Sequence, residues 1–290
     1  MSVALFAPRP ASGGVWENRS MIEIRDVSFG YTGAPRPALT HVSLTVAPGE
    51  LVGVVGANGS GKSTLARLCD GLLLPDEGAV LVDGIDTREA ARVWEVRSLV
   101  GLVLQDPDDQ IVGTVVEEDV AFGPENLGVP REEIRSRVDA ALEAVGLTGL
   151  ERREPHLLSE GQKQRLAIAG ALALQPAYLV MDEPSAMLDP RGRADVLAIV
   201  DALVRGGTGV LQVSHRLADV ARADRVVALA EGRVVYEGPP AGLLGDKAMM
   251  ARAGVALPPI GELAAALRAR GVPVPAGALT AESVVAALWA

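Results

Sequence analysis

Residues 56–63 read GANGSGKS and fit the pattern G-x-x-x-x-G-K-[ST]. The glycines let successive backbone N–H groups turn inward around phosphate oxygens, and a following helix adds partial positive charge at its first turn. In this pattern Lys62 would reach the terminal phosphates and Ser63 would bind Mg²⁺. The residues expected to line the loop are Gly56, Asn58, Gly59, Ser60, Gly61, Lys62, Ser63 and Thr64. A glycine-rich turn with a chance lysine is the alternative.

A second group follows the apolar run 178–181, which ends in the carboxylates Asp182 and Glu183. Alone, two such residues are often just the solvated end of a strand. With a phosphate loop upstream, Asp182 is expected to support Mg²⁺ and Glu183 to polarise an attacking water. The two motifs together predict a site that binds and hydrolyses ATP.

Two further polar residues follow apolar runs. His215 comes after the run 210–213, and Gln105 ends the run 99–104 and begins a polar loop, 105–110. Strand ends are where α/β proteins place their sites. A structural histidine and a solvated turn remain the alternatives for these positions considered alone.

The segment 158–162, LSEGQ, precedes a strong helical pattern that continues to Leu172. Ser159 with Gln162 three residues later forms the sequence of a capping box, so a well-started helix is the simplest interpretation. The functional interpretation is that this helix start presents Ser159, Glu160, Gly161 and their backbone N–H groups to a phosphate.

The elements that must position these groups alternate along the chain. Short apolar runs at 51–55, 99–104, 178–181, 210–213 and 226–229 predict buried strands, and residues 22–29 alternate as a half-buried strand does. A helical pattern at 134–145 lies between two of them. Strands that alternate with helices predict an α/β fold with a mainly parallel sheet. From Gly238 onward, prolines punctuate short helical segments, which predicts a small separate tail.

Composition narrows the function classes. The net charge of −10 argues against nucleic acid as a partner, because phosphate contacts need clustered Lys and Arg. The single cysteine, Cys69, can close no intrachain disulfide, so a reducing compartment is expected. No apolar run reaches the roughly 20 residues of a membrane-spanning helix. Residues 1–20 are expected to be a disordered leader, and translation could start at Met1 or Met21.

The order of these motifs resembles the ATP-binding cassette family over residues 22–238. The resemblance implies a P-loop NTPase cassette with a small antiparallel β subdomain and a helical signature subdomain at about 111–172. It implies ATP and Mg²⁺ as cofactors, and two chains packed head to tail around two ATP molecules. Further roles are implied for Tyr31 (adenine stacking), Gln105 (sensing Mg²⁺ and the membrane partner), residues 158–162 (the signature), Asp189 (the interface loop) and His215 (the γ-phosphate).

A narrower resemblance rests on residues 105–110, 119–126, 162–170 and 185–190. These segments are similar to the ATPase subunits of energy-coupling-factor importers, which take up vitamins or transition-metal ions. The resemblance implies a homodimer or a paralogous heterodimer, an integral transmembrane subunit and a membrane-embedded substrate-binding subunit. It places the chain peripherally on the cytoplasmic face of the cell membrane and gives residues 239–290 a role in dimerisation.

Glu160 departs from the family pattern, which usually has glycine at this position. A carboxylate in the first helical turn favours the helix dipole, but it also adds negative charge near the expected γ-phosphate. We therefore expect Glu160 to point away from the nucleotide or to weaken the closed dimer slightly.

Three rival functions are open on the sequence. Another importer class would use the same cassette. A soluble cassette protein acting on DNA or ribosomes should show a coiled-coil insertion, zinc-binding cysteines or two fused cassettes, none of which this sequence contains. A non-catalytic cassette is disfavoured because Glu183 and His215 are both present.

Overall fold

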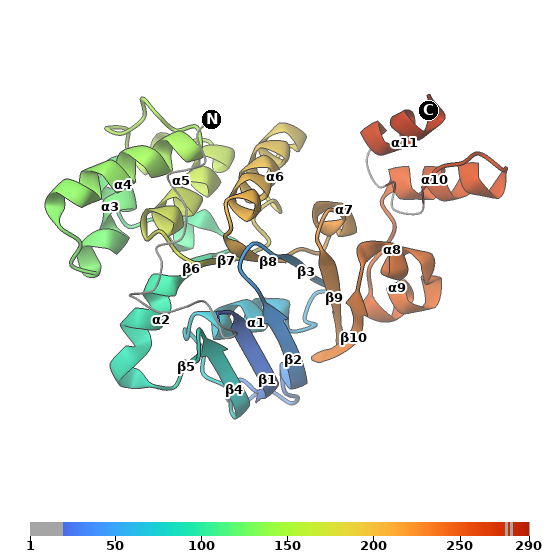
Figure 1. Cartoon of the computed structure of the whole chain (residues 1–290), viewed down its shortest axis with the longest axis horizontal. Helices are drawn as coiled ribbons and strands as arrows, with labels where there is room; N and C mark the ends of the chain where they lie inside the picture. Colours follow the sequence, from blue (N-terminus) through green and yellow to red (C-terminus); the bar gives the residue numbers. More distant parts are fainter. Residues whose placement is uncertain (1–19, 276–277, 279–280, 290) are drawn as a thin grey trace.

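Two β-sheets with one helix between them form the centre of the molecule (Figure 1). The computed structural model describes residues 20–275, 278 and 281–289. The predicted leader, apart from Ser20, lies outside the described residues. The predicted α/β class, with a mainly parallel sheet and a smaller antiparallel one, is confirmed.

The larger sheet has six strands in the order β10-β9-β3-β8-β7-β6. The five strands from β9 to β6 run parallel, and β10 pairs antiparallel with β9 at one edge. The apolar runs of the sequence form its buried strands, because both faces of the sheet are covered. The strands are β3 (Leu51–Gly56), β6 (Val100–Val103), β7 (Tyr178–Asp182), β8 (Gly209–Val213), β9 (Arg225–Ala230) and β10 (Arg233–Gly238).

One strand boundary differs from the prediction. Leu99 is the last residue of α2 (Val93–Leu99), and β6 begins only at Val100. Leu104 also lies outside β6, and its N–H donates to the side chain of Gln110. A continuous apolar run cannot reveal where a helix passes directly into a strand, since both are buried on this face.

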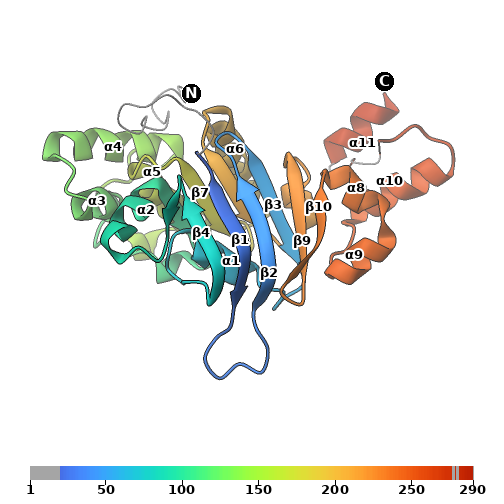
Figure 2. The same cartoon turned by 60° about the horizontal axis from the view of Figure 1, so that its bottom comes forward.

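The smaller sheet is antiparallel, in the order β2-β1-β4-β5, and lies in front of the central sheet in Figure 2. Helix α1 (Lys62–Cys69) contacts both sheets, so its apolar residues join a shared core that includes the buried Cys69. The start of α1 is thereby fixed relative to β7 and β8. The strands are β1 (Ile22–Phe29), β2 (Leu39–Val46), β4 (Glu77–Val82) and β5 (Ile85–Asp86).

Helices between β6 and β7 form a block at one side of the central sheet (Figure 1). They are α3 (Val116–Asn126), α4 (Arg131–Ala144) and α5 (Glu160–Ala173), and they pack on one another through an apolar core that continues onto the sheet. Two more helices follow strands β7 and β8: α6 (Pro190–Arg205) and α7 (Leu217–Val220). Short 3-10 turns are η2 (Ala90–Arg92), η3 (Pro107–Asp109) and η4 (Pro155–Leu157).

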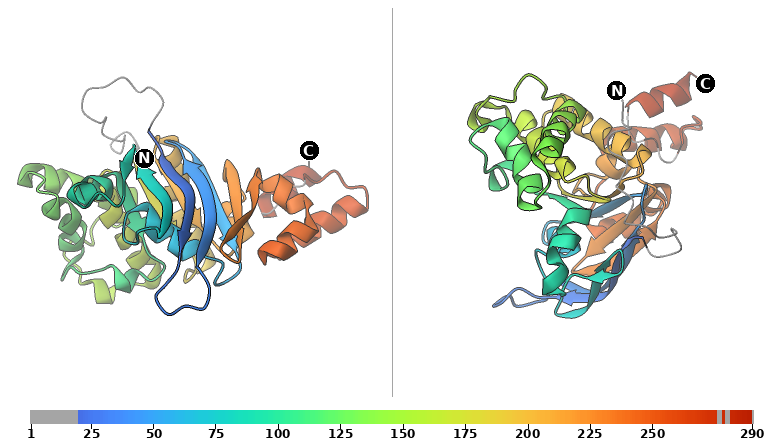
Figure 3. Two further views of the ribbon diagram at one scale, coloured as in Figure 1. Left: turned by 90° about the horizontal axis from the view of Figure 1, so that it is seen from below. Right: turned by 60° about the vertical axis from the view of Figure 1, so that its left-hand side comes forward.

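The tail lies at the opposite end of the molecule from this helical block (Figure 3). It consists of α8 (Pro240–Gly245), α9 (Lys247–Ala253), α10 (Pro259–Ala269) and α11 (Ala281–Leu288). Helices α8 and α9 pack on β9 and β10, whereas α10 and α11 share a small core of their own. The predicted helical tail is therefore present, and its first half is continuous with the main core.

Candidate functional site

The phosphate loop connects the buried strand β3 to the start of α1. Gly61 adopts a left-handed conformation with φ of 104°, and a Cβ there would lie 2.5 Å from the carbonyl oxygen of Ala38. Only glycine fits this position. Gly61 also gives α1 no side-chain cap, so the helix start presents backbone N–H groups without a protein acceptor. Such a helix start suits an anion.

Lys62 is buried at the base of this loop, where its Nζ donates to the carbonyl oxygens of Gly56 and Ala57 at 3.0 Å each. Burial lowers the pKa of Lys62, while the nearby Glu183 and Asp182 act to raise it. The Ser60 hydroxyl is also buried and has no hydrogen-bond partner among the described residues. The loop thus holds a buried ammonium group and a hydroxyl without a partner among the described residues, and both groups can bind phosphate oxygens.

Ser63 and Asp182 meet across the gap between α1 and β7. The Ser63 hydroxyl donates to Oδ1 of Asp182 at 3.1 Å. Burial raises the pKa of Asp182, with the hydrogen bond from Ser63 acting in the opposite direction. Asp182 ends β7, and its pairing with Val213 in β8 fixes the height of the carboxylate along the sheet.

Glu183 adopts a left-handed conformation with φ of 49°, which is uncommon for a residue with a side chain. Its N–H donates to the carbonyl oxygen of Val213 at 3.1 Å, so the neighbouring strand holds the turn. The turned carboxylate lies 4.0 Å from Nζ of Lys62 and 2.8 Å from Nδ1 of His215. Backbone strain at a polar residue that lies beside Lys62 and His215 is typical of functional sites.

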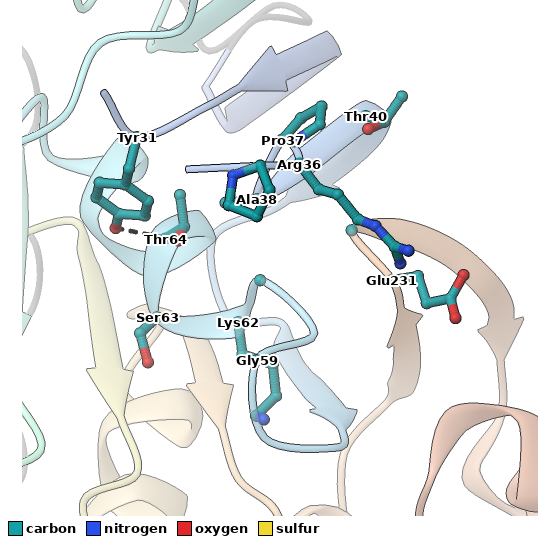
Figure 4. Close-up of a pocket in the computed structure, with 13 residues that line it drawn as sticks. Tyr31, Arg36, Pro37, Ala38, Thr40, Gly59, Lys62, Ser63, Thr64 and Glu231 are labelled. Atoms are coloured by element: carbon teal, nitrogen blue, oxygen red, sulfur yellow. Dashed lines mark hydrogen bonds between the residues drawn. The ribbon is translucent and has the colours of Figure 1, made fainter. Parts of the chain in front are cut away.

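A pocket of about 600 Å³ opens beside the loop and is lined by Tyr31, Gly59 and residues 61–64. We call it the phosphate pocket (Figure 4). The Tyr31 hydroxyl lies 3.1 Å from Oγ1 of Thr64, and the Tyr31 ring packs edge-on against Phe29. Five of the eight predicted loop residues therefore line one cavity with Tyr31, whereas Gly56, Asn58 and Ser60 do not line it. Arg36 and Glu231 also line it and were not expected, because they occupy turns without a motif.

Gln105 lies outside this cavity. It is exposed at the carboxyl end of β6 and, within the part of the chain that the structure describes, it does not line the phosphate pocket. The loop that carries it is anchored by Gln110, whose side chain donates to the carbonyl oxygen of Leu102 and accepts from the N–H of Leu104. Asp119 fixes the following turn through the N–H groups of Val112 and Gly113.

The segment 158–162 starts α5 as predicted, with a complete capping box. The Ser159 hydroxyl accepts from the N–H of Gln162, and the Gln162 side chain accepts from the N–H of Ser159. A second pocket, of about 520 Å³, opens at this helix start. We call it the signature pocket; it is lined by Ser159, Glu160, Gly161, Arg165, Met187, Leu188, Asp189, Arg191, Gly192 and Asp195.

Asp189 lines the signature pocket and caps α6, where its Oδ1 accepts from the N–H of Gly192 at 2.7 Å. Glu160 lies 3.2 Å from Nζ of Lys163, and Lys163 also contacts Asp108 at 2.8 Å. The charge of Glu160 is thus shared with a cation one turn along the helix. The two pockets have no lining residue in common.

The tail reaches the phosphate loop from the other side. The N–H of Ala57 donates to the carbonyl oxygen of Ala253, the last residue of α9, at 2.9 Å. Gly254 follows with φ of 66°, and a Cβ there would lie 2.7 Å from Cβ of Ala57. Glycine is therefore required for the end of α9 to approach the loop this closely.

The described residues form neither a membrane-spanning helix nor a metal-binding cluster. No helix among them is long and apolar enough to cross a bilayer. No group of three or more His, Cys, Asp or Glu residues is placed there to hold a metal ion.

A phosphate loop after a central strand, two carboxylates at the end of a neighbouring parallel strand and an inserted helical block define a P-loop nucleoside triphosphatase. The chain belongs to the ABC transporter family: the sequence model of that family matches residues 39–186, about half of the chain. It is therefore an ATPase subunit of a transporter.

Its relatives sharpen this assignment. The chain is 55% identical, over 87% of its length and 88% of the relative's, to the energy-coupling factor transporter ATP-binding protein EcfA1 of Symbiobacterium thermophilum. It is 43% identical to the cobalt import ATP-binding protein CbiO of Syntrophus aciditrophicus, over 91% of this chain and 94% of that protein. The predicted resemblance to energy-coupling-factor ATPases is confirmed.

Solved structures agree with the fold. CbiO1 of Clostridium perfringens, described as part of the ABC transporter complex cbiONQ, superposes with a TM-score of 0.72 at 33% identity, over 85% of this chain and 99% of that one. A dimeric bacterial ABC transporter cassette, MJ0796, superposes with a TM-score of 0.70 at 29% identity, over 76% of this chain and 98% of that one.

Proposed function

We propose that two such chains, either identical or paralogous, pack head to tail so that each ATP lies between the phosphate pocket of one chain and the signature pocket of the other. The observation that carries this proposal is the division of the site into two open pockets without a shared lining residue. A similar cassette is described as a dimer, which supports the same arrangement.

In the phosphate pocket, the loop residues from Gly56 to Thr64 hold the phosphates, and Tyr31 stacks on the adenine. Lys62 moves from the carbonyl oxygens of its own loop to the β- and γ-phosphates, which are stronger acceptors for a buried ammonium group. A flat aromatic ring that is 42% exposed suits a base that enters and leaves.

Ser63 and Asp182 fit Mg²⁺, because a hydroxyl and one carboxylate are the few hard oxygen ligands with which this ion is usually held beside phosphates. The raised pKa of Asp182 fits as well, since a cation would stabilise the ionised carboxylate. When bound, Mg²⁺ neutralises charge that develops on the phosphates. Gln105 is proposed to sense this ion and the membrane partner from the neighbouring strand end.

Glu183 and His215 act on the attacking water. Glu183 accepts a hydrogen bond from the water and directs it at the γ-phosphorus, and ADP departs on the opposite side. His215 holds the Glu183 carboxylate at 2.8 Å and is placed to contact the γ-phosphate. The partner chain completes the site with Ser159, Gly161 and Asp189, whose pocket faces outward in a single chain.

The ATPase is proposed to power an energy-coupling-factor importer for a vitamin or a transition-metal ion from the cytoplasmic face of the membrane. The names of the relatives support this assignment, since they belong to energy-coupling-factor and cobalt import proteins. The partners are an integral transmembrane subunit and a substrate-binding membrane subunit. The transported solute is recognised by the substrate-binding subunit and not by this chain.

We further propose that residues 21–238 form the cassette and that residues 239–290 join the two ATPases. Large apolar side chains on α10, on α11 and just after α11 are exposed, which supports a partner surface there. They are Leu263, Val285, Leu288 and Trp289.

Substitution of Glu183 by Gln tests the catalytic part. We expect turnover to fall by about a hundredfold to a thousandfold, because the carboxylate that directs the water is lost. ATP should still bind, and ATP-bound dimers should accumulate on size-exclusion chromatography. The exposed Glu154→Gln is the matched control. Equal turnover of Glu183→Gln and wild type would refute the assignment of Glu183.

Copurification tests the partners. The tagged full-length chain, solubilised from its native membrane, should bring down a transmembrane subunit that mass spectrometry identifies. Recovery with ribosomes or DNA alone would refute the importer assignment.

A further inference from the structure

Asp219 is a buried carboxylate that the mechanism above does not use. It lies in α7, two residues beyond Leu217, and is only 1% exposed. One of its oxygens, Oδ2, accepts two hydroxyl hydrogen bonds, from Ser185 at 2.6 Å and from Ser214 at 3.2 Å. Its other oxygen lies 4.0 Å from Nε of Arg193.

The groups around Asp219 come from three segments that carry proposed site residues. Ser185 follows Glu183 by two positions, and Ser214 directly precedes His215. Arg193 lies in the first turn of α6, the helix that Asp189 caps. A single carboxylate therefore contacts, or lies beside, the segments of the water-directing residue, the histidine and the interface loop.

The direction of these hydrogen bonds is fixed. The Ser214 hydroxyl accepts from the N–H of Arg216 at 3.0 Å, so its own proton is free to point at Asp219. Both serine hydroxyls are buried and donate to the same oxygen. One oxygen of Asp219 therefore links the two segments through both hydroxyls, in addition to the hydrogen bond from the Glu183 N–H to the Val213 carbonyl oxygen.

The helix that carries Asp219 is itself held tightly against the sheet. A Cβ at Gly53 in β3 would lie 2.6 Å from Cβ of Val220, so only glycine allows α7 to approach this closely. Leu217 and Val220 are fully or almost fully buried beside it. The helix that carries the Asp219 carboxylate is thus closely packed against β3.

We propose that Asp219 is a positioning residue that keeps Glu183 and His215 in hydrogen-bond distance and fixes the interface loop relative to them. Desolvating a carboxylate is costly, and an apolar residue would fill the same space at lower cost. The presence of a carboxylate at position 219 is explained by the two serine hydroxyls that donate to it. This inference rests on the proposed roles of Glu183 and His215.

The test compares Asp219→Ala with Asp83→Asn in the full-length chain, in the assembly in which it hydrolyses ATP. Asp83 is a suitable control because it accepts the hydroxyl of Tyr178, at the opposite end of β7. We expect kcat of Asp219→Ala to fall by about tenfold to a hundredfold, as displaced catalytic groups do. The affinity for ADP should change by less than about twofold, since Lys62 and Ser63 do not contact Asp219.

The serines provide a second measurement that does not remove the charge. The double variant with Ser185→Ala and Ser214→Ala should lower kcat as Asp219→Ala does. Replacing Ser214→Ala by Ser214→Thr in this double variant returns a hydroxyl and should restore most of the activity. A purely structural role would lower the melting temperature and leave kcat per folded molecule unchanged. If Asp219→Ala does not fold, the serine variants decide the question.

Two outcomes are distinguishable in the same assay. If Glu183→Gln and His215→Ala leave kcat unchanged, the proposed catalytic roles are wrong. If those two variants lose activity while Asp219→Ala and the serine variants match Asp83→Asn, the positioning role of Asp219 is overturned.

Discussion

The phosphate pocket and the signature pocket are built on different principles. The first lies beside the phosphate loop, where Lys62 lines it and the neighbouring Asp182 accepts from Ser63. Both Lys62 and Asp182 are almost completely buried and bonded within the chain. The second lies at an exposed helix start, where Ser159 is held by a capping box of local origin. The lysine and serine that line the phosphate pocket lie beside Asp182 and Glu183, whereas no lysine stands among the described residues that line the signature pocket.

This difference indicates which steps of ATP binding and hydrolysis depend on each pocket. A pre-organised, buried pocket can bind nucleotide in a single chain, because its geometry does not depend on a partner. An exposed pocket at a capped helix start gains its function only when a phosphate is brought to it. Binding should therefore depend on the first pocket, and turnover on both.

Among the variants that test the comparison of the two pockets, Asp182→Asn should have the largest effect. Turnover should fall by about a hundredfold, because the carboxylate that accepts from Ser63 loses its charge. The nucleotide-free protein should melt at an equal or higher temperature. The raised pKa of Asp182 means that the wild type loses stability as pH rises from the ordinary carboxyl pKa through the folded one, and Asn lacks this loss.

Steady-state ATPase assays and calorimetry at neutral pH measure both effects. A variant that loses turnover and also unfolds more easily would contradict the inference that the buried charge of Asp182 destabilises the nucleotide-free protein.

Ser159→Ala should lower turnover by about tenfold, while a single chain keeps its affinity for ADP. Loss of the helix cap alone costs about 1 kcal/mol, so the two effects must be separated. Ser159→Asn is the control, since Asn caps a helix well but has no hydroxyl. Restored stability without restored turnover would support the role of Ser159 across the interface, and weakened ADP binding would contradict the division between pockets.

Tyr31→Ala should raise KM for ATP by about threefold to tenfold with little change in kcat, because an aromatic contact of this kind contributes about 1 kcal/mol. Tyr31→Phe keeps the ring and removes only the contact with Thr64, so its KM should stay near that of the wild type. Equal KM values for Tyr31→Ala and wild type would refute adenine stacking.

Glu160→Gly should have the smallest effect, raising turnover or ATP-driven dimerisation by less than about threefold, since exposed charges paired with a lysine interact weakly. Chromatography in ATP with the Glu183→Gln background measures dimerisation. An unchanged dimer fraction would show that Lys163 compensates Glu160 completely.

Much of both pockets could be predicted from the sequence because the sequence signals that mark them are local. The loop motif, the apolar strands and the capping box each depend on neighbouring residues, and the structure places them as expected. The contact between Glu183 and His215 depends on β7 and β8 being adjacent. The sequence places both residues at strand ends, but it does not determine which strands are neighbours.

Other groups carried no signal. Asp219 belongs to none of the motifs in the sequence, and its burial depends on the close packing of α7 against Gly53. The left-handed conformation of Glu183 is set by the carbonyl oxygen of Val213, 30 residues further along the chain. Long-range hydrogen bonds of this kind are properties of the fold and leave no pattern in the local sequence.

The contact between Ala57 and the end of α9 bears on how the tail should be studied. Deleting residues 239–290 to ask whether they join two ATPases would also strip a hydrogen-bond acceptor from the phosphate loop. A truncated protein that fails to hydrolyse ATP would therefore report a damaged loop as readily as a lost partner. The informative variants leave α8, α9 and Gly254 in place and change only the exposed side chains Leu263, Val285 and Leu288 to polar ones.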